Sequence, residues 1–250
     1  MPRLVRSVLS ALIVVFVTPA LARAQAEPPA VDPAWSGSLG IGIALTQGNR
    51  DSSTANLSYE LRRRMAESPI VFQSKGLMLR GSTEGELTTS RFGLEARVDR
   101  RFGDRTSLFA QTQYLRDRFK EIDYFVAPSA GVSHLVVVAD ATEVGVSVGL
   151  GSVWERNRNF GVTFDGALVA GQQIKRQLSD TAQFTQSLSA LWKVHDFGDS
   201  LYALNLGLAA TVTTRTQLKL ELVDTYRSRQ QDPTVLKNDV SVVVSVVFKY

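Results

Sequence analysis

The residues of this chain best suited to chemistry are its two histidines and the polar residues beside them. Ser133 adjoins His134, and Asp196 follows His195. A serine, a histidine and a carboxylate within hydrogen-bond reach could hydrolyse lipid esters. In an extended strand, however, neighbours such as Ser133 and His134 point to opposite faces. Two distant histidines and no cysteine also give no metal-ligand spacing. The sequence therefore predicts neither enzyme activity nor a cofactor or metal, and a lipid-acting enzyme is kept as an alternative.

A glycine-rich segment could suggest a phosphate-binding loop. Gly145, Gly149 and Gly151 fall on alternate positions of an apolar stretch, and no helix is expected after it. Small residues on one face of a strand explain this spacing more simply, because they leave room for bulky side chains nearby.

The histidines and glycines named above are expected to lie on β-strands or at their ends. The strand pattern is clearest in the last thirteen residues of the sequence. The even positions of residues 238–250 are mostly apolar and end on aromatics: Val240, Val242, Val244, Val246, Phe248 and Tyr250. The odd positions are mostly polar. Such alternation predicts a strand with one apolar and one polar face.

The same period of two recurs along the chain with short polar or glycine-bearing breaks. It predicts twelve strands, at about residues 35–46, 55–62, 70–80, 91–102, 108–114, 126–136, 143–155, 163–175, 183–194, 202–212, 218–227 and 238–250. The segments 70–80 and 163–175 alternate poorly and are included because antiparallel closure needs an even number. Residues 81–87 and 228–236 are expected to be the longer loops.

The N-terminus has the pattern of a secretory signal. Arg3 and Arg6 precede an apolar run of ten residues, and Ala22-Arg-Ala24 is typical of a cleavage site. Ten residues fall short of the roughly 20 that a membrane-spanning helix needs. We expect a signal peptide at residues 1–24, a proline-containing periplasmic linker at 25–34, and a single domain at 35–250.

The charge balance gives no reason to expect a nucleic-acid partner. The chain has 28 basic and 24 acidic residues, and removing Arg3, Arg6 and Arg23 with the signal peptide would leave a net charge of about +1. No run of Lys or Arg forms a basic stripe. After residue 24 no apolar run is long enough for a membrane helix, so a membrane location would require a barrel.

The aromatic residues decide between a membrane barrel and a soluble periplasmic carrier barrel. With both termini on the periplasmic side, one set falls near the periplasmic rim: Trp35, Phe102, Phe184, Phe248 and Tyr250. A second set falls near the outer rim: Phe92, Tyr114, Tyr124, Trp154, Trp192, Tyr202 and Tyr226. Two aromatic girdles around an aliphatic belt are typical of lipid headgroup boundaries. The pattern favours an all-β, transmembrane, antiparallel up-and-down β-barrel of about twelve strands.

The predicted inner face carries many charges, which would each cost about 2–4 kcal/mol if they faced lipid at the midplane. They are Glu60, Arg62, Arg64, Arg91, Glu95, Arg97, Asp99, Arg101, Glu143, Glu155, Lys193, Lys219 and Glu221. Long Arg and Glu side chains in a barrel of this size favour a narrow or occluded lumen.

Several segments, taken in order, resemble the bacterial outer-membrane family of unknown function 481, the salt-induced outer-membrane proteins. They are Trp35-Ser-Gly-Ser-Leu-Gly, Thr46-Gln-Gly-Asn-Arg-Asp51, Tyr114 to Asp123, Ala130 to Leu135, Leu178-Ser-Asp180 and Lys237-Asn-Asp239. The resemblance spans about residues 35–250. Ser133-His134 departs from the family pattern, in which a Gly-Tyr-like pair is commoner. The resemblance implies a barrel but no substrate and no catalytic residues.

These observations favour an outer-membrane protein that serves as a narrow passive pore or a structural envelope component of a Gram-negative bacterium. The alternatives are a lipid-acting barrel enzyme and a soluble periplasmic carrier. The expected partners are outer-membrane lipid, lipopolysaccharide and the barrel insertion machinery, because the terminal Phe248 and Tyr250 resemble the signal that this machinery reads. The sequence leaves the oligomeric state open.

Overall fold

A computed structural model describes residues 35–47, 52–64, 68–83, 86–158, 161–229 and 237–249. The predicted signal peptide, the linker and Tyr250 lie outside these residues. The described chain is built of strands, and none of it is a helix long and apolar enough to cross a membrane.

Twelve strands follow one another in the described part of the chain. Their bounds are β1 (Trp35–Gln47), β2 (Ser52–Arg64), β3 (Ile70–Thr83), β4 (Glu86–Phe102), β5 (Thr106–Asp117), β6 (Ile122–Ala139), β7 (Thr142–Asn157), β8 (Gly161–Gln177), β9 (Ala182–Lys193), β10 (Ser200–Thr211), β11 (Thr216–Arg227) and β12 (Asn238–Lys249). The predicted strand number is confirmed, and the weakly alternating segments 70–80 and 163–175 lie within β3 and β8.

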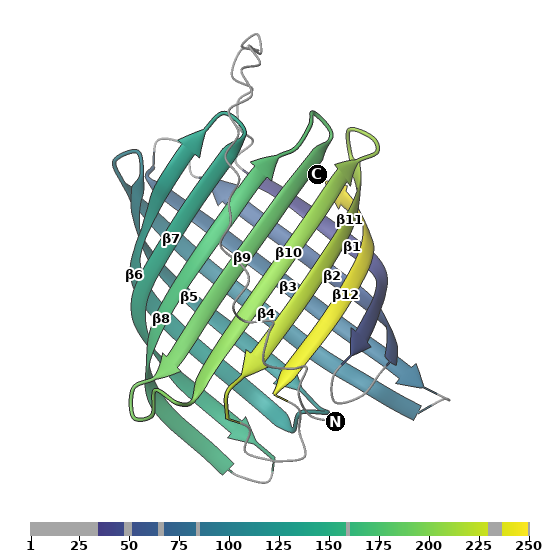
Figure 1. Cartoon of the computed structure of the whole chain (residues 1–250), viewed down its shortest axis with the longest axis vertical. Coiled ribbons are helices and arrows are strands. Elements are labelled where there is room, and N and C mark those ends of the chain that lie inside the picture. Colours follow the sequence, from purple (N-terminus) through teal and green to yellow (C-terminus); the bar gives the residue numbers. More distant parts are fainter. Residues whose placement is uncertain are drawn as a thin grey trace, which may run out of the picture. The chain divides into compact units, whose positions relative to one another are not determined.

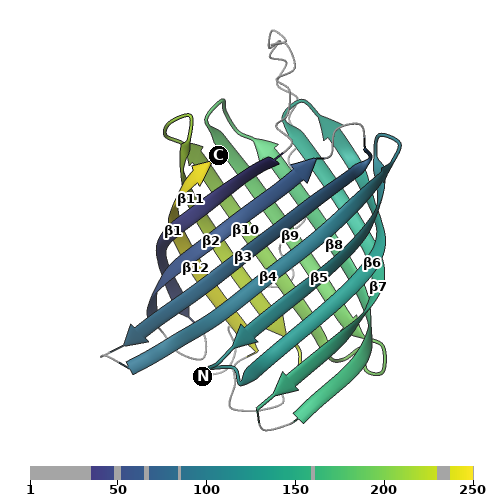
Figure 2. The same ribbon diagram turned by 180° about the vertical axis from the view of Figure 1, so that it is seen from behind.

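The strands close into an antiparallel up-and-down barrel, as Figures 1 and 2 show from two sides. Each strand pairs with its neighbours in sequence, and β1 pairs with β12 from Ser38↔Lys249 to Gln47↔Val240. This closure leaves no unpaired sheet edge among the described strands. We call the end where β1 begins and β12 ends the terminal end (top of Figure 1), and the opposite end the distal end.

The expectation of a loop at residues 81–87 is wrong. β3 continues through Thr83, β4 begins at Glu86, and a register shift falls between Gly81 and Ser82. The small and polar residues of this segment predict a break, but antiparallel pairing extends into it, with Ser82 opposite Leu87 and Thr83 opposite Glu86.

The outward face of the strands is apolar, in agreement with the period of two. The exposed large side chains include Leu39, Ile41, Val148, Leu150 and Phe248. Side chains of the opposite parity line the lumen. There, an apolar cluster near the distal end joins Phe125, Val153 and Leu191 from β6, β7 and β9.

Register shifts near the distal end keep this inner cluster in place. Pairing shifts between Leu115 and Asp117 in β5 and between Ile122 and Tyr124 in β6. As a result, Ile122 and Phe125 are both buried in the lumen although their sequence positions differ in parity.

Candidate functional site

The register places the predicted inward charges on the face opposite the exposed apolar side chains. Glu155 and Asp99 are buried; Arg64, Arg91, Glu95, Arg97, Lys193, Lys219 and Glu221 are half-buried; Glu60, Arg62, Arg101 and Glu143 are exposed. Their surroundings differ between the two ends of the barrel. Near the distal end, Lys193 and Arg227 gather around one buried carboxylate, that of Glu155, which makes this end the candidate site.

The centre of the distal site is Glu155 on β7, whose side chain is completely buried. Arg227 Nη1 and Nη2 donate to its two carboxylate oxygens at 2.5 and 2.8 Å, and Asn157 Nδ2 donates to Oε1 at 3.0 Å. Lys193 Nζ lies 3.8 Å from Oε2. A buried carboxylate needs such a set of donors, since an unpaired charge there would be costly.

The contact between Arg227 and Glu155 crosses the lumen. Arg227 belongs to β11 and Glu155 to β7, and β8, β9 and β10 separate these strands along the wall. Asp199, in the turn between β9 and β10, joins the same group. Its Oδ2 accepts from Lys193 Nζ at 2.6 Å, and its Oδ1 lies 3.8 Å from Arg227 Nε.

A second contact crosses the lumen from the turn between β5 and β6. Lys120 forms an ion pair with Asp239 at the start of β12, on the opposite side of the barrel. Asp117 Oδ1 accepts from the backbone N–H groups of Phe119 and Lys120, which holds the turn in shape. We call Lys120, Glu155, Asn157, Lys193, Asp199, Arg227 and Asp239 together the distal network.

Two influences oppose each other at Lys120. Burial, followed by the repulsion of Arg91, lowers the pKa of Lys120 to about 8, and Asp117 acts in the other direction. The contact with Asp239 favours the charged ammonium group. The ion pair with Asp239 therefore favours the protonated form of Lys120, whereas burial and the neighbouring Arg91 favour the neutral form.

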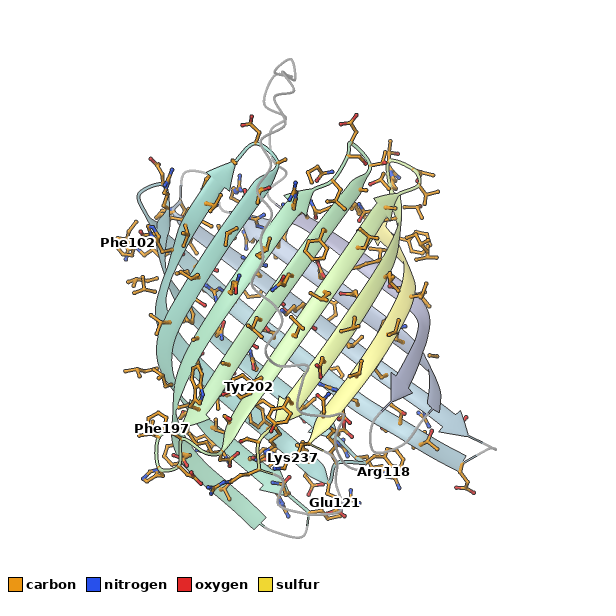
Figure 3. The ribbon with its side chains drawn as sticks, in the orientation of Figure 1. Phe102, Arg118, Glu121, Phe197, Tyr202 and Lys237 are labelled. Atoms are coloured by element: carbon orange, nitrogen blue, oxygen red, sulfur yellow. The ribbon has the colours of Figure 1, made fainter. Side chains whose placement is uncertain are left out.

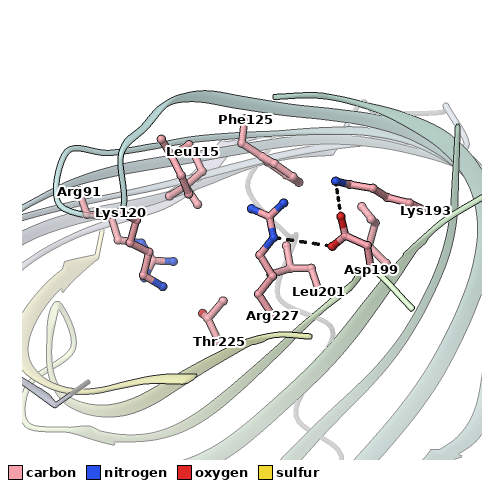
Figure 4. A pocket seen from close by; sticks show the side chains of 11 residues that line it. Arg91, Leu115, Lys120, Phe125, Lys193, Asp199, Leu201, Thr225 and Arg227 are labelled. Carbon is pink, nitrogen blue, oxygen red and sulfur yellow. Dashed lines mark hydrogen bonds and ion pairs between the residues drawn. The ribbon is translucent and has the colours of Figure 1, made fainter. Parts of the chain in front are cut away.

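A cavity of about 40 Å³ lies between the two crossings, enough for a few water molecules. Figure 4 shows Arg91 and Lys120 on one side of it and Lys193, Asp199 and Arg227 on the other. Leu115, Ile122, Phe125, Leu191 and Leu201 form its apolar lining. The distal lumen is therefore narrowed by charged side chains that lie over an apolar wall.

In the terminal half of the lumen, charges pair along the wall. Arg97 Nη2 donates to Asp99 Oδ1 on the same strand at 2.7 Å, and to Ser133 Oγ on β6 at 2.7 Å. Lys75 Nζ lies 3.2 Å from Glu95 Oε2 on the adjacent strand. These contacts keep side chains close to the sheet.

The longest contact of the terminal half joins Lys219 on β11 to Glu60 on β2, with Nζ 3.0 Å from Oε1. Lys219 Nζ also lies 3.0 Å from Glu221 Oε1. β12 and β1 lie between these strands, and β1 carries glycine at positions 40 and 42, where an added Cβ would collide with neighbouring strands. The two glycines leave room on β1 for the lysine side chain.

The predicted interface aromatics fall near the two ends of the barrel. Trp35, Phe102 and Phe248 are exposed near the terminal end, and Trp154 is exposed near the distal end. Tyr124 is half-buried on the outer face at the distal end. Trp192, Tyr202 and Tyr226 pack together there, with Trp192 Nε1 donating to Tyr202 Oη at 3.0 Å. In Figure 3, Phe102 and Tyr202 lie toward opposite ends of the barrel.

The histidines do not assemble a hydrolytic centre. His134 Nδ1 lies 3.0 Å from Thr106 Oγ1, and His195 Nδ1 lies 2.7 Å from Asp165 Oδ1, both at exposed positions. The absence of a Gly-x-Ser-x-Gly motif, expected from the sequence, is wrong, because Gly145-Val-Ser147-Val-Gly149 has this pattern. Ser147 lies inside β7 rather than on a strand-to-helix turn.

Metal binding finds no support in the part of the chain that the structure describes, where no three His, Asp or Glu side chains converge as ligands. The distal network includes residues that alternation could not find. Lys120 and Asp199 lie in turns, where the period of two does not apply. Arg227 and Asp239 fall at odd, mostly polar positions of the predicted strands 218–227 and 238–250, but the period of two does not predict that they reach across the lumen.

The family profile described as protein of unknown function, DUF481, matches residues 39–250. The chain belongs to the DUF481 family. The predicted resemblance is thereby confirmed. Among curated proteins, no sequence matches this DUF481 protein.

Several solved barrels resemble the DUF481 protein in fold. The NanC porin aligns with a TM-score of 0.58 at 10% identity, covering 85% of this chain and 100% of the porin. An outer-membrane channel from Pseudomonas putida F1 gives 0.53 at 11% identity, covering 90% and 100%. The translocator domain of the autotransporter NalP from Neisseria meningitidis gives 0.53 at 13% identity, covering 88% and 89%. At these identities the likeness concerns the fold.

Proposed function

We propose that this DUF481 protein is a narrow passive pore of the bacterial outer membrane, without enzymatic activity. The outward face supports a lipid environment, because apolar side chains such as Val148 and Leu150 are 57% and 69% exposed. In water, so large an apolar surface would be a liability for a monomer. Porins and channels among the similar folds agree with this proposal.

The observation that carries the pore proposal is the contrast between the two faces of one wall. Apolar side chains face outward, while the inward face carries ion pairs that need either water or each other. The distal network would be the narrowest part of the path. It places an arginine and a lysine across the lumen, so we expect low conductance in the wild-type protein.

The location implies export and assembly. A signal peptide at residues 1–24 would direct the chain to the periplasm, and the outer-membrane insertion machinery would assemble the barrel. The exposed Phe248 near the end of β12 supports a role for the C-terminal strand as the assembly signal. Membrane lipid and lipopolysaccharide would then surround the outer face.

Single-channel recording in planar bilayers tests the pore. The informative variant is the double substitution Glu155→Ala/Arg227→Ala, which removes the crossing side chain without leaving a buried unpaired carboxylate. We expect small discrete steps from the wild-type protein and larger steps from the double variant. Lys75→Ala/Glu95→Ala, which removes a pair along the wall, is the matched control and should leave the conductance unchanged.

Two outcomes would contradict the proposal. If folded, inserted wild-type protein and the double variant both give no conductance steps, the barrel is not a pore. If the wild-type protein also releases fatty acid from phospholipid vesicles, the result favours the alternative of a lipid-acting barrel enzyme. A control pair that raises conductance as much as the distal pair would refute the assignment of the constriction.

A further inference from the structure

Arginines follow aromatic residues on the outer face of two strands near the distal end. On β5, Tyr114 is followed two positions later by Arg116. On β7, Trp154 is followed by Arg156, and Arg158 lies just past the end of the strand. Residues two positions apart share a face, so ring and guanidinium group lie on the same outward side. Arg116, Arg156 and Arg158 are all exposed.

The two strands bring these arginines to one patch. Only β6 separates β5 from β7, which puts their backbones about 10 Å apart. The register sets Phe92 opposite Arg116 and Tyr124 opposite Arg156, so aromatic and basic side chains alternate along one row of the wall. Two further arginines lie near the same end of the barrel: Arg80 on β3, and Arg118 in the turn between β5 and β6.

Asp123, an acidic residue within the patch, holds Arg156 and Arg158 only loosely. Asp123 Oδ2 lies 3.7 Å from Arg156 Nε, and its Oδ1 lies 3.7 Å from Arg158 Nη2. Both distances exceed hydrogen-bond length. The side chains of Arg156 and Arg158 are 57% and 52% exposed. Their donor groups are therefore available to a ligand that approaches from the membrane side.

The expected depth of these arginines in the membrane indicates which chemical group they bind. Aromatic rings at a barrel rim sit at the boundary between hydrocarbon and headgroups. Two further residues along a strand tilted by about 45° add roughly 5 Å toward the aqueous side. This places the guanidinium groups at the level of headgroup phosphates. Arginine binds phosphate through paired N–H donors, which suits this position.

Arginines at the terminal rim have a different arrangement. Arg63 Cζ lies 4.8 Å from the centre of the Trp35 ring, and Arg100 Cζ lies 5.3 Å from the centre of the Phe102 ring. There each guanidinium group is engaged by an aromatic ring on its own strand or the adjacent one. At the distal rim the arginines lie beyond the rings and beside one another.

We propose that Arg116, Arg156 and Arg158 form a binding site for the phosphate groups of lipopolysaccharide on the outer face of β5–β7. The inference rests on the proposed outer-membrane location. The positive charge of the three arginines is complementary to phosphate, and the site adjoins the aromatic girdle. The ligand is therefore an outer-leaflet lipid that carries phosphate on its headgroup. Bound lipid would anchor this side of the barrel in the membrane.

Binding of purified lipopolysaccharide to the detergent-solubilised, folded barrel tests the site. The variant Arg116→Gln/Arg156→Gln/Arg158→Gln should bind about 100-fold more weakly than the wild-type protein. Arg63→Gln/Arg100→Gln at the terminal rim is the control and should keep the wild-type affinity. Lipopolysaccharide stripped of its phosphates should bind the wild-type protein as weakly as the intact lipid binds the triple variant.

Three results would overturn the site: unchanged affinity in the triple variant, equal losses in the control, or undiminished binding of the dephosphorylated lipid. Equal affinity for vesicles of phosphatidylglycerol would show a general anionic surface instead and would also overturn it. Insertion into vesicles is measured separately. A barrel that inserts into vesicles but does not bind lipopolysaccharide refutes the binding site alone. A barrel that stays soluble without detergent refutes the proposed membrane location.

Discussion

The two halves of the lumen contain similar side chains in different arrangements. In the distal half, Arg227 reaches Glu155 past three intervening strands of the closed barrel, and Lys120 meets Asp239 from the opposite side. In the terminal half, Arg97 and Lys75 pair with residues on their own or adjacent strands. The first arrangement divides the lumen, and the second leaves its centre open.

The complete burial of one carboxylate, more than the number of charges, distinguishes the distal end. Glu155 is fully buried against an apolar wall, so it depends on its partners for solvation. Lys75 is 56% exposed and has water as an alternative partner. Removing one member of a pair should therefore have unequal effects in the two halves.

The largest effect is expected for Arg227→Ala. It leaves the Glu155 carboxylate buried with only Asn157 as a close donor, and breaking one side of a buried pair costs about 3–5 kcal/mol. The free energy of unfolding, measured by denaturant titration of the barrel in lipid vesicles, checks this. Lys75→Ala in the terminal half is the control, with an expected cost of about 0–1 kcal/mol. Equal losses would remove the distinction between the halves.

Most of the fold could be predicted from the sequence because a barrel wall repeats one simple rule. Lipid on one side and water on the other impose a period of two, and β12 shows it at nearly every position. The weaker strands β3 and β8 were found through the even strand number rather than through their own residues. The strand residues 81–83, 86 and 87 were missed because small and polar residues can extend a strand as well as end it.

The candidate site could be predicted only in part. Alternation places Glu155 and Lys193 on the inner face, but it carries no information on partners several strands away. The contact between Arg227 and Glu155 depends on the curvature of the closed wall. Lys120 and Asp199 come from turns, and the register shifts in β5 and β6 bring Ile122 and Phe125 inward together. None of these features has a period that a sequence could display.

The next effect in size concerns the wall that both halves share. Val148, in the middle of β7, is 57% exposed on the outer face. Val148→Arg should lower the free energy of unfolding in vesicles by about 2–4 kcal/mol, the cost of a lipid-facing arginine near the midplane. The neighbouring Ser147→Arg puts the same charge in the lumen, where Gly145, Gly149 and Gly171 leave space. A larger loss for Ser147→Arg than for Val148→Arg would contradict an aqueous lumen inside an apolar belt.

The smallest effect, and the sharpest test of the comparison, is expected for Lys219→Ala. Lys219 binds Glu60 and Glu221, but the side chain of Glu60 is 60% exposed, so water can replace the ammonium group. The expected cost is about 0–1 kcal/mol at low salt. Since exposed pairs are screened, this cost should vanish near 1 M salt, where the Debye length is about 3 Å. The cost of Arg227→Ala should persist at the same salt concentration, because the side chain of Glu155 is completely buried and salt screens buried pairs much less. If both costs fell together, water and ions would fill the distal end as freely as the terminal end, and the distal network could not be the constriction.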